Sequence, residues 1–574
     1  MNKETKTCQN CQKDFTIESE DFDFYEKIKM PPPTFCPECR LVRRMCFRNE
    51  RALYKNKCEL CGKPTLSIYN IDSPFHIYCH DCWWSDKWEA SDYGVEYDFN
   101  EPFFGKFGKL SDIVPKLALS GANMVKCDYC NFSTNERECY LNSASEGNER
   151  VMFGNRVIYN KDSFDLYIGD RCELCYELVN CLKCYKLFFG RNCIQCSDSA
   201  FLVDCSNCMN CFGCINLRNK QYCIFNEQYT KEQYQSKLQE LKNNSFEVFK
   251  KIKKQYSEFV LQHPRRFATI IKSIQATGDN IRYAKNCHFC FDVVGNPSAE
   301  DTKFAIWAGE NLKDSYDVGP GVGIGVERCY EIFDCTQNSR LLSCHTVYNS
   351  VDAFYCINCH ASSHLFACIG LRNKQHCILN KQYTKEEYEA LVPKIISHMN
   401  DMPYTDKKGR VYKYGEFFPT ELSPFAYNET IAQEYFPLTK QQAQEQGYLW
   451  KDPEPRNYQI TIKSQDLPDN IKDVEDSILK EIIGCAHQGR CNEQCTEAFR
   501  IIPQELAFYR RMNLPLPRLC PNCRHYQRLK QRNPLKLWKR QCMAPGCPNT
   551  FETSYAPDRP EIVYCEACYL KEVV

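Results

Sequence analysis

Residues 166–196 read LYIGDRCELCYELVNCLKCYKLFFGRNCIQC. A pattern of apolar residues, a glycine and two cysteines occurs twice in this stretch, at an offset of 21: Leu166-Tyr-Ile-Gly169 with Cys172 and Cys175, then Leu187-Phe-Phe-Gly190 with Cys193 and Cys196. A short period of alternating apolar residues, with Asn, Asp and Gly between them, is typical of stacked β-coils. The stretch therefore predicts a parallel β-solenoid, in which like side chains form ladders at this offset.

The middle of the chain is a tandem duplication. Residues 175–234 align without gaps with residues 329–388, at an offset of 154. In the second half Cys335, Cys356 and Cys377 again follow one another at an offset of 21. We therefore expect two cysteine-rich solenoids.

The 23 cysteines between Cys127 and Cys377 have two interpretations. Cysteine is small and buries well, so most of them are expected to pack as core ladders. Alternatively, some ladders hold metal, for example Cys172, Cys175, Cys193 and Cys196. The second half has Val347 and Ser350 in place of the last two, so the coil does not need a metal there.

Helical patterns follow each solenoid. Apolar residues recur at helical spacing over residues 230–260. The Gln-Tyr-Thr-Lys-Glu sequence at the start of this segment, residues 228–232, recurs as residues 382–386 at the start of a second segment, residues 384–399. These helices are expected to cap the open β-edges. The predicted fold class is mainly β and multi-domain, with these boundaries: 1–90, double zinc-ribbon module; 91–124, connector; 125–227, first solenoid; 228–280, helical cap; 281–381, second solenoid; 382–484, helical and irregular wrap; 485–574, double zinc-ribbon module.

Sixteen further cysteines predict metal sites at both ends of the chain. Two CxxC turns converge to give a tetrahedral, four-sulfur zinc cage, which has no open coordination position and so favours a structural role over catalysis. About four Zn²⁺ ions per chain are expected, on Cys8, Cys11, Cys36, Cys39, Cys58, Cys61, Cys79, Cys82, Cys491, Cys495, Cys520, Cys523, Cys542, Cys547, Cys565 and Cys568.

The two ends are copies of one module, since residues 11–58 match residues 495–542 without gaps at an offset of 484. The N-terminal copy carries the motifs Cys8xxCys11, Phe15, Phe24-Tyr25, Pro33, the box Cys36-Pro-Glu-Cys39-Arg40, and Arg43-Arg44. On these motifs each end resembles the small bacterial probable zinc-ribbon family of treble-clef type, a resemblance that implies zinc binding. The whole chain resembles uncharacterised cysteine-rich bacterial proteins with such ribbons and a repetitive middle.

One departure from this pattern leaves the fourth ligand of the third zinc site undecided. Cys491 stands one residue earlier than the match requires, so either Cys485 or Cys491 could complete the third site.

Composition limits the remaining possibilities. With 73 basic and 73 acidic residues the net charge is zero, so no global field attracts nucleic acid or membrane. The sequence has no apolar run of the roughly 18 residues that a membrane helix needs. It has no signal-like start, and its CxxC pairs favour reduced thiols. We expect a cytoplasmic, multi-domain protein without membrane contact and with no evident small-molecule substrate.

Basic residues gather beside the predicted zinc sites. With nearby aromatic residues they have the composition of a surface for phosphate contact and base stacking. Equally, they could simply offset the negative charge of the cages. The candidate nucleic-acid contacts are Arg40, Arg43, Arg44, Arg48, Arg524, Arg528, Lys530, Arg532 and Lys539.

The sequence leaves three functions open. The first is a non-catalytic zinc protein that binds nucleic acid, RNA rather than DNA because no recognition-helix motif is visible. The second is a protein-interaction scaffold that uses the solenoid face. The third is a thiol- or metal-handling protein. Catalysis finds little support, because the eleven histidines are scattered.

Overall fold

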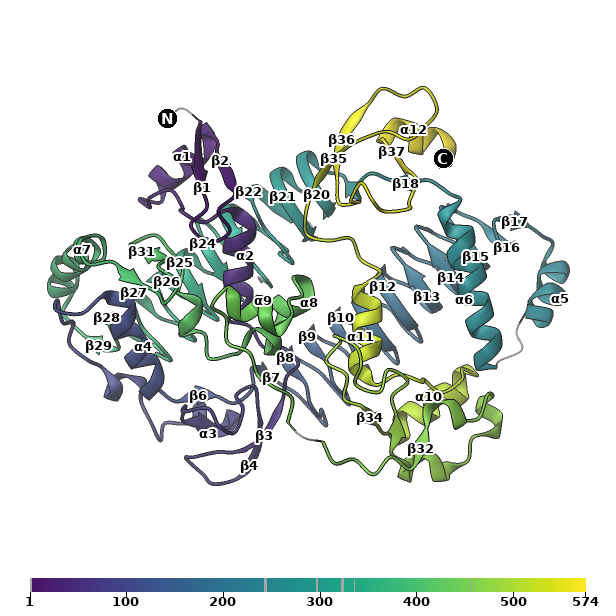
Figure 1. Cartoon of the computed structure of the whole chain (residues 1–574), viewed down its shortest axis with the longest axis horizontal. Coiled ribbons are helices and arrows are strands. Elements are labelled where there is room, and N and C mark those ends of the chain that lie inside the picture. Colours follow the sequence, from purple (N-terminus) through teal and green to yellow (C-terminus); the bar gives the residue numbers. More distant parts are fainter. Residues whose placement is uncertain are drawn as a thin grey trace.

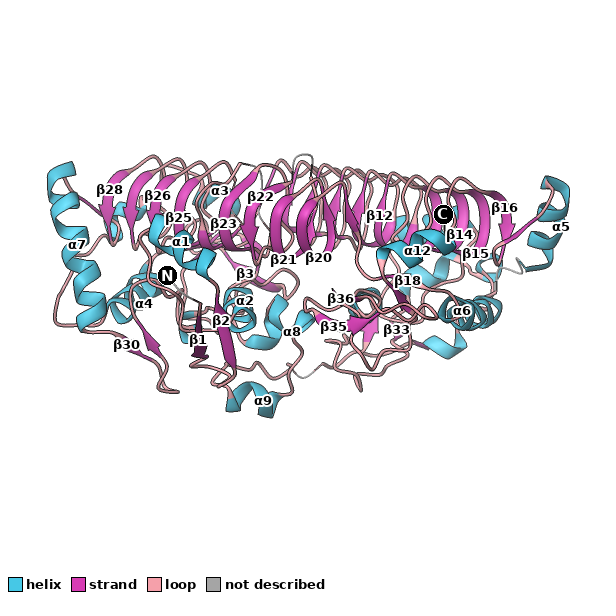
Figure 2. Ribbon diagram, turned by 90° about the horizontal axis from the view of Figure 1, so that it is seen from above, coloured by secondary structure: helices cyan, strands magenta, loops and turns pink. Residues whose placement is uncertain are grey.

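Two long stacks of β-coils form the body of the protein (Figures 1 and 2). The computed structural model describes residues 3–241, 245–295, 298–321, 325–334, 336–454 and 456–573. Within these residues, each stack contains one sheet of eleven strands. Helices and small sheets from the rest of the chain pack against both stacks, so the fold is mixed α/β and not the mainly β fold that the sequence predicts.

The first stack runs from residue 121 to residue 228. Its strands pair in chain order and in parallel until the antiparallel β17. They are β7 (Gly121–Ala122), β8 (Asn131–Thr134), β9 (Ser143–Glu146), β10 (Asn155–Ile158), β11 (Phe164–Asp170), β12 (Tyr176–Leu182), β13 (Tyr185–Arg191), β14 (Ser197–Val203), β15 (Met209–Ile215), β16 (Gln221–Ile224) and β17 (Glu227–Gln228).

The second stack runs from residue 270 to residue 382, and it likewise ends in an antiparallel strand. Its strands are β19 (Ile270–Ile271), β20 (Ile274–Arg282), β21 (Lys285–Val293), β22 (Ala299–Lys303), β23 (Leu312–Val318), β24 (Tyr330–Phe333), β25 (Ser339–His345), β26 (Val351–Phe354), β27 (Ser363–Phe366), β28 (Gln375–Ile378) and β29 (Lys381–Gln382).

Successive coils of the first stack are related by an offset of 12, and the predicted offset of 21 is wrong. Leu166 pairs with Leu178, and Cys211 pairs with Cys223. Every third residue of the first stack has a positive φ near +50°, as at Asp165, Ile168 and others, so four such triplets complete one coil. Twenty-one is also a multiple of three, so side chains at that offset share an inward orientation but lie on different sides of the coil.

The core of the first stack is a set of cysteine and leucine ladders. Cys172, Cys184, Cys196 and Cys208 occupy the same position in successive coils and are fully buried. Each thiol donates to backbone carbonyls; the Cys172 Sγ lies 3.6 Å from the Asp170 oxygen and 3.5 Å from the Cys181 oxygen. In the described part of the chain, no thiol of either stack belongs to a group of ligands close enough to share an ion. Cys335 lies outside the described residues.

Helices follow both antiparallel end strands, as the sequence predicts. After the first stack come α5 (Lys231–Leu241) and α6 (Phe246–Leu261), separated by residues outside the described part. After the second stack comes α7 (Lys385–Asp401), whose N-cap Thr384 accepts a hydrogen bond from the Glu387 amide. In the predicted connector, α4 (Phe103–Ile113) packs Phe103 on Tyr355 and Phe366 of the second stack.

The N-terminal module contains three small helices and five short strands, followed by two further short elements. These elements are β1 (Glu4–Thr7), β2 (Asp14–Ile17), α1 (Ser19–Lys27), α2 (Pro37–Met45), β3 (Tyr54–Lys57), β4 (Pro64–Ser67), β5 (Ile77–Tyr78), α3 (His80–Trp83), the 3₁₀ helix η1 (Ala90–Tyr93) and β6 (Lys116–Leu117).

The C-terminal third wraps around the stacks before it forms the second module. Its elements are β30 (Tyr404–Thr405), β31 (Val411–Tyr412), η2 (Thr420–Leu422), η3 (Tyr427–Glu429), α8 (Ile431–Tyr435), α9 (Lys440–Glu445), β32 (Ile462–Lys463), η4 (Ser464–Asp466), η5 (Ile471–Asp473), η6 (Asp476–Lys480), β33 (Ile483–Gly484), β34 (Ala498–Phe499), α10 (Pro503–Met512), α11 (Pro521–Leu529), β35 (Trp538–Gln541), β36 (Thr550–Thr553), β37 (Val563–Tyr564) and α12 (Glu566–Val573).

Each terminal module docks on the stack that lies farther from it along the chain. Helix α2 packs on β23 and β24 of the second stack, whereas α11 packs on β11 and β12 of the first (Figure 1). The chain therefore crosses over, and each half of the molecule is built from both halves of the sequence.

Candidate metal centres and the docked arginines

Four clusters of four cysteines lie in the terminal modules. In each cluster the sulfur atoms all lie within 4.8 Å of one another. The clusters are Cys8, Cys11, Cys36 and Cys39; Cys58, Cys61, Cys79 and Cys82; Cys485, Cys495, Cys520 and Cys523; and Cys542, Cys547, Cys565 and Cys568. These four groups are geometrically suited to metal ions.

The sulfur separations fit tetrahedral coordination. Neighbouring Sγ atoms are 3.7 Å apart for Cys11 and Cys36, 3.9 Å for Cys61 and Cys79, and 3.9 Å for Cys547 and Cys565. A tetrahedron with zinc–sulfur bonds of about 2.3 Å has edges of about 3.8 Å.

Local backbone structure prepares the thiols for a cation. The second pair of each cluster begins at the start of a helix, and in three clusters Cys36, Cys79 and Cys520 are the N-cap residues. Free amides and the helix dipole at this end favour thiolates. The Cys36 amide donates to Cys8 Sγ at 3.2 Å, and the Cys565 amide donates to Cys542 Sγ at 3.2 Å. A side-chain hydrogen bond from Asn549 is the main cause that lowers the pKa of Cys565 to about 6.

Cys485, and not Cys491, completes the third cluster. The Cys520 amide donates to Cys485 Sγ at 3.3 Å, the same contact that Cys36 makes with Cys8. Cys491 lies beside the cluster, with its Sγ 3.7 Å from that of Cys523. The gap-free match with the N-terminal copy begins only at Cys495, so the alignment could not decide between the two cysteines.

Arginines of the N-terminal module are buried against the second stack. Arg40 pairs with Asp317 at 2.9 Å, and both side chains are almost fully buried. Arg43 lies 2.7 Å from Glu331 and 2.9 Å from Glu416. Burial raises the pKa of Glu331 to about 7, although Arg43 lowers it.

Arg44 and Arg48 are buried in the same interface. Arg44 lies 3.4 Å from Asp317 and donates to the Gly319 carbonyl at 3.0 Å. Arg48 lies 2.6 Å from Glu50, and its guanidinium stands 4.1 Å from the centre of the Phe132 ring of the first stack.

The C-terminal module makes the same contacts with the first stack. Arg524 and Arg528 pair with Asp165 at 3.3 and 2.7 Å. Asp165 precedes Asp317 at an offset of 152, and the arginines follow Arg40 and Arg44 at an offset of 484. The duplicated modules and the duplicated stacks therefore share one docking arrangement.

Aromatic residues repeat this equivalence. Phe24 stacks on Tyr316 with ring centres 3.9 Å apart, and Phe508 stacks on Phe164 at 4.0 Å. The sequence placed Phe24 and Phe508 in the zinc-ribbon motif; their role in the structure is to dock the module.

The predicted surface of arginines is consequently wrong for six positions. Arg40, Arg43, Arg44, Arg48, Arg524 and Arg528 are each at most 3% exposed. These arginines face buried carboxylates of the stacks, which lie far away in the sequence and so do not enter a count of the charges near the arginines. Arg532 is half-buried against the Tyr435 ring, and Lys530 pairs with Glu493; Lys530 and Lys539 remain exposed.

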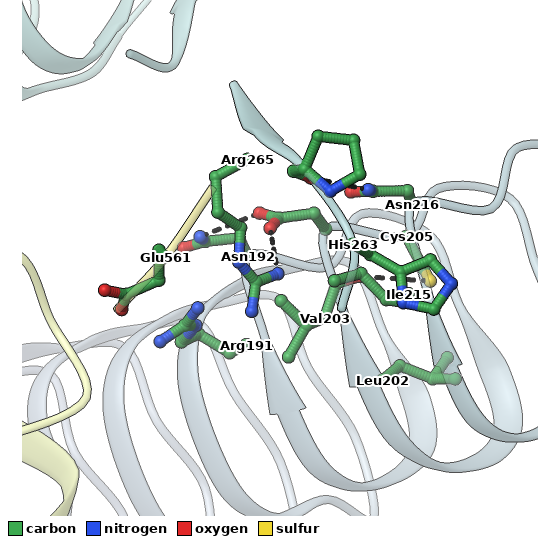
Figure 3. A network of polar contacts seen from close by, with 12 residues as sticks. Arg191, Asn192, Leu202, Val203, Cys205, Ile215, Asn216, His263, Arg265 and Glu561 are labelled. Carbon is green, nitrogen blue, oxygen red and sulfur yellow. Dashed lines mark hydrogen bonds and ion pairs between the residues drawn. The ribbon is translucent and has the colours of Figure 1, made fainter. Parts of the chain in front are cut away.

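The segment after α6 ties the C-terminal module to the first stack. Arg265 donates to Asp204 at 3.1 Å, and Asp204 also accepts from Asn192 at 2.9 Å (Figure 3). Next to Arg265, the Pro264 carbonyl accepts from Asn216 at 2.8 Å. Strand β18 (Arg265–Arg266) then pairs with β37 of the module.

A groove of about 620 Å³ opens between the two stacks. The first stack contributes Phe132, Ala144 and Ile158, the second contributes Val294, Trp307 and Tyr348, and the N-terminal module contributes Arg48 and Trp84. Trp84, Ile158 and Val294 are exposed apolar side chains in this groove. No signal in the sequence pointed to the groove, because its residues come from segments that meet only after docking.

Comparison of the chain with models of known protein families and with curated proteins finds no match. The structure shows four tetra-cysteine clusters consistent with zinc-binding modules, and the comparisons identify no family. Among the described residues, no helix has the length and apolar character needed to cross a membrane.

Proposed function

We propose that this protein is a non-catalytic, zinc-stabilised scaffold that binds an extended apolar segment of a partner protein between its two solenoids. The groove between the stacks is the observation that carries the proposal. Zinc holds the modules that fix the position of one stack relative to the other.

The donor sets support zinc at the four clusters. Four thiolates at tetrahedral spacing suit zinc, and a closed four-sulfur cage leaves no position for a substrate. The first and third cages lie at the start of α2 and α11, the helices that carry the arginines that dock on the stacks. In this proposal the metal therefore supports the interface between module and stack.

The groove supports a partner protein as the ligand. Its volume is about 620 Å³, and its walls come from both stacks and from the N-terminal module. Exposed apolar groups gathered in one place are typical of interaction sites. The two arginines that line it are engaged: Arg48 lies 2.6 Å and Arg156 lies 2.8 Å from Glu50, so the described lining presents little free positive charge to a phosphate.

Nucleic-acid binding stays a prediction with a reduced set of residues. The six buried arginines are engaged with carboxylates and aromatic rings, and Lys530 and Lys539 remain as exposed cations of the original set. A thiol- or metal-handling function likewise stays a prediction.

A peptide library panned on the intact protein tests the proposal. Ala144→Trp is designed to fill the groove, because Ala144 stands between Phe132 and Arg156 at the equivalent position of successive coils. Ala144 has a φ of 52°, a conformation that Phe132 and Tyr159 already adopt with large side chains. Asn207→Trp, at a φ of 53° and away from the groove lining, is the matched control.

Peptides rich in apolar residues should bind the natural protein and Asn207→Trp, and should bind Ala144→Trp at least tenfold more weakly. Equal binding to all three proteins contradicts the proposal. Single-stranded RNA serves as the second probe. If the affinity for RNA is the same for the natural protein and Ala144→Trp, and falls steeply as the salt concentration rises, the nucleic-acid function is favoured instead.

A further inference from the structure

The third cysteine cluster has a longer loop than its N-terminal counterpart. Two residues separate Cys8 from Cys11, whereas residues 486–494 separate Cys485 from Cys495. This longer loop carries three potential metal ligands of its own: His487, Cys491 and Glu493.

These ligands converge on a sulfur of the cluster. One ligand atom from each of His487, Cys491, Glu493 and Cys523 lies within 4.8 Å of every other. Cys523 Sγ is 3.7 Å from that of Cys491 and 3.9 Å from that of Cys485, so it faces both groups. His487 Nδ1 is 3.1 Å from Glu493 Oε2.

Two polar atoms of this group are buried without hydrogen bonds. Glu493 is 5% exposed, and its Oε2 faces the buried Nδ1 of His487 at 3.1 Å without the geometry of a hydrogen bond. Neither atom has a hydrogen-bond partner among the described residues. Buried polar atoms are normally paired, and an unpaired carboxylate oxygen is costly. Lys530 engages the other oxygen, Oε1, and leaves Oε2 directed at His487.

The separations fit a tetrahedral ion. Zinc bonds of about 2.3 Å to sulfur give a sulfur–sulfur edge of about 3.8 Å, and bonds of about 2.0–2.1 Å to nitrogen and oxygen give an edge of about 3.3 Å. The observed 3.7 and 3.1 Å lie close to these values.

We propose that His487, Cys491, Glu493 and Cys523 bind a second zinc ion, and that the Cys523 thiolate bridges it to the ion of the third cluster. The inference rests on the zinc sites of the proposed function and adds a fifth ion per chain. Soft thiolates combined with imidazole and carboxylate are ligands that zinc accepts.

In the N-terminal module, the sulfur equivalent to that of Cys523 belongs to Cys39, and it accepts a hydrogen bond. There Asn10 donates its side-chain amide to Cys39 Sγ at 3.3 Å. An amide donor on Cys39 and a second ion on Cys523 are two ways to stabilise the equivalent thiolate. The two modules therefore differ in metal content although they dock alike.

The bridge makes the fifth ion depend on the third cluster, and not the reverse. The fifth ion needs Cys523 held in place by the third cluster, whereas the third cluster keeps four cysteines without the fifth ion. Since His487 and Cys491 are partly exposed and all four cysteines of the third cluster are buried, a chelator should remove the fifth ion before the ion of the third cluster.

Zinc content of the purified full chain tests the inference. After reconstitution with zinc and gel filtration, the natural protein should hold five ions, and Cys491→Ser and Glu493→Gln should hold four. Glu497→Gln is the matched control, because Glu497 lies just beyond the same loop and outside the ligand group, and it should hold five. Cys523→Ser should hold three, since it removes a ligand from both ions.

Four ions in both the natural protein and Cys491→Ser overturn the fifth site. If Cys485→Ser then also keeps four, a single ion exchanges between Cys485 and Cys491. Fewer than four ions in the natural protein contradict the zinc proposal itself, a separate result. Cobalt reconstitution gives a second readout: the absorbance change on adding a fifth equivalent should be absent in Cys491→Ser.

Discussion

Asp165 and Asp317 each form ion pairs with two buried arginines. Both are fully buried and both have a φ near +55°. Removing one partner of a buried ion pair leaves an uncompensated charge, which typically costs about 3–5 kcal/mol. In each docked module, one carboxylate therefore balances the charge of two buried arginines.

Asp165→Asn should lower the melting temperature of the zinc-loaded protein, with a loss of about 3 kcal/mol or more in unfolding free energy. Asparagine tolerates the left-handed backbone, so the change removes charge without straining the turn. Asp162→Asn is the control: its partner Arg150 is half-exposed, and the loss should stay below about 1 kcal/mol. Equal losses in calorimetry would contradict the docking role.

Glu434 gives the fold a pH dependence. It lies on α8, between Arg51 and His525, and burial raises its pKa to about 7 although Arg51 lowers it. Because the folded state holds this proton more tightly than the unfolded state, its contribution to stability falls as pH rises from about 4.5 to 7. Relative to Glu434→Gln, the natural protein should lose melting temperature over this range, and parallel curves for the two proteins would refute this.

At the scale of the element, the triplet is the unit from which each coil is built. One residue in three faces the core, one faces outward and one has a positive φ. Asn, Asp and Lys are frequent at the third position, but aromatic residues also occur there. The three-residue repeat is therefore hard to recognise in the sequence, and the spacing of 21 is easier to see than the true spacing of 12.

Asn207→Val should destabilise the first stack by about 1–3 kcal/mol, because a β-branched residue is strained at its φ of 53°. The neighbouring Ser206→Val should cost little, since its extended backbone favours β-branched side chains. Denaturant unfolding of the two variants gives the comparison. If Ser206→Val were the more damaging change, the assignment of the third position would be refuted.

At the scale of the whole molecule, the crossed docking links segments far apart in the chain. Removing residues 485–574 should speed hydrogen exchange in β11 and β12, on which α11 packs, and spare β23 and β24. Removing residues 1–90 should have its main effect on β23 and β24. The opposite distribution of exchange, with each deletion loosening the stack nearer in sequence, would contradict the crossed arrangement.

Local spacing in the sequence is enough to predict the elements that depend on it. The cysteine pairs indicated four-sulfur clusters at both ends, because a short turn places two thiolates on one face. The repeated pattern of apolar residues, glycine and cysteine indicated stacked parallel coils, although not their true offset. The helix after the second stack was predicted from the repeated Gln-Tyr-Thr-Lys-Glu sequence, and Thr384 of this sequence is its N-cap.

What those elements do together depends on contacts between segments that are far apart in the chain. The tertiary structure selected Cys485 over Cys491, because the longer loop folds back on Cys523. It buried the arginines, because Asp165 and Asp317 lie hundreds of residues away from them and no local count of charge can pair such groups. The groove between the stacks follows from this same docking, since its walls belong to segments that only the ion pairs bring together.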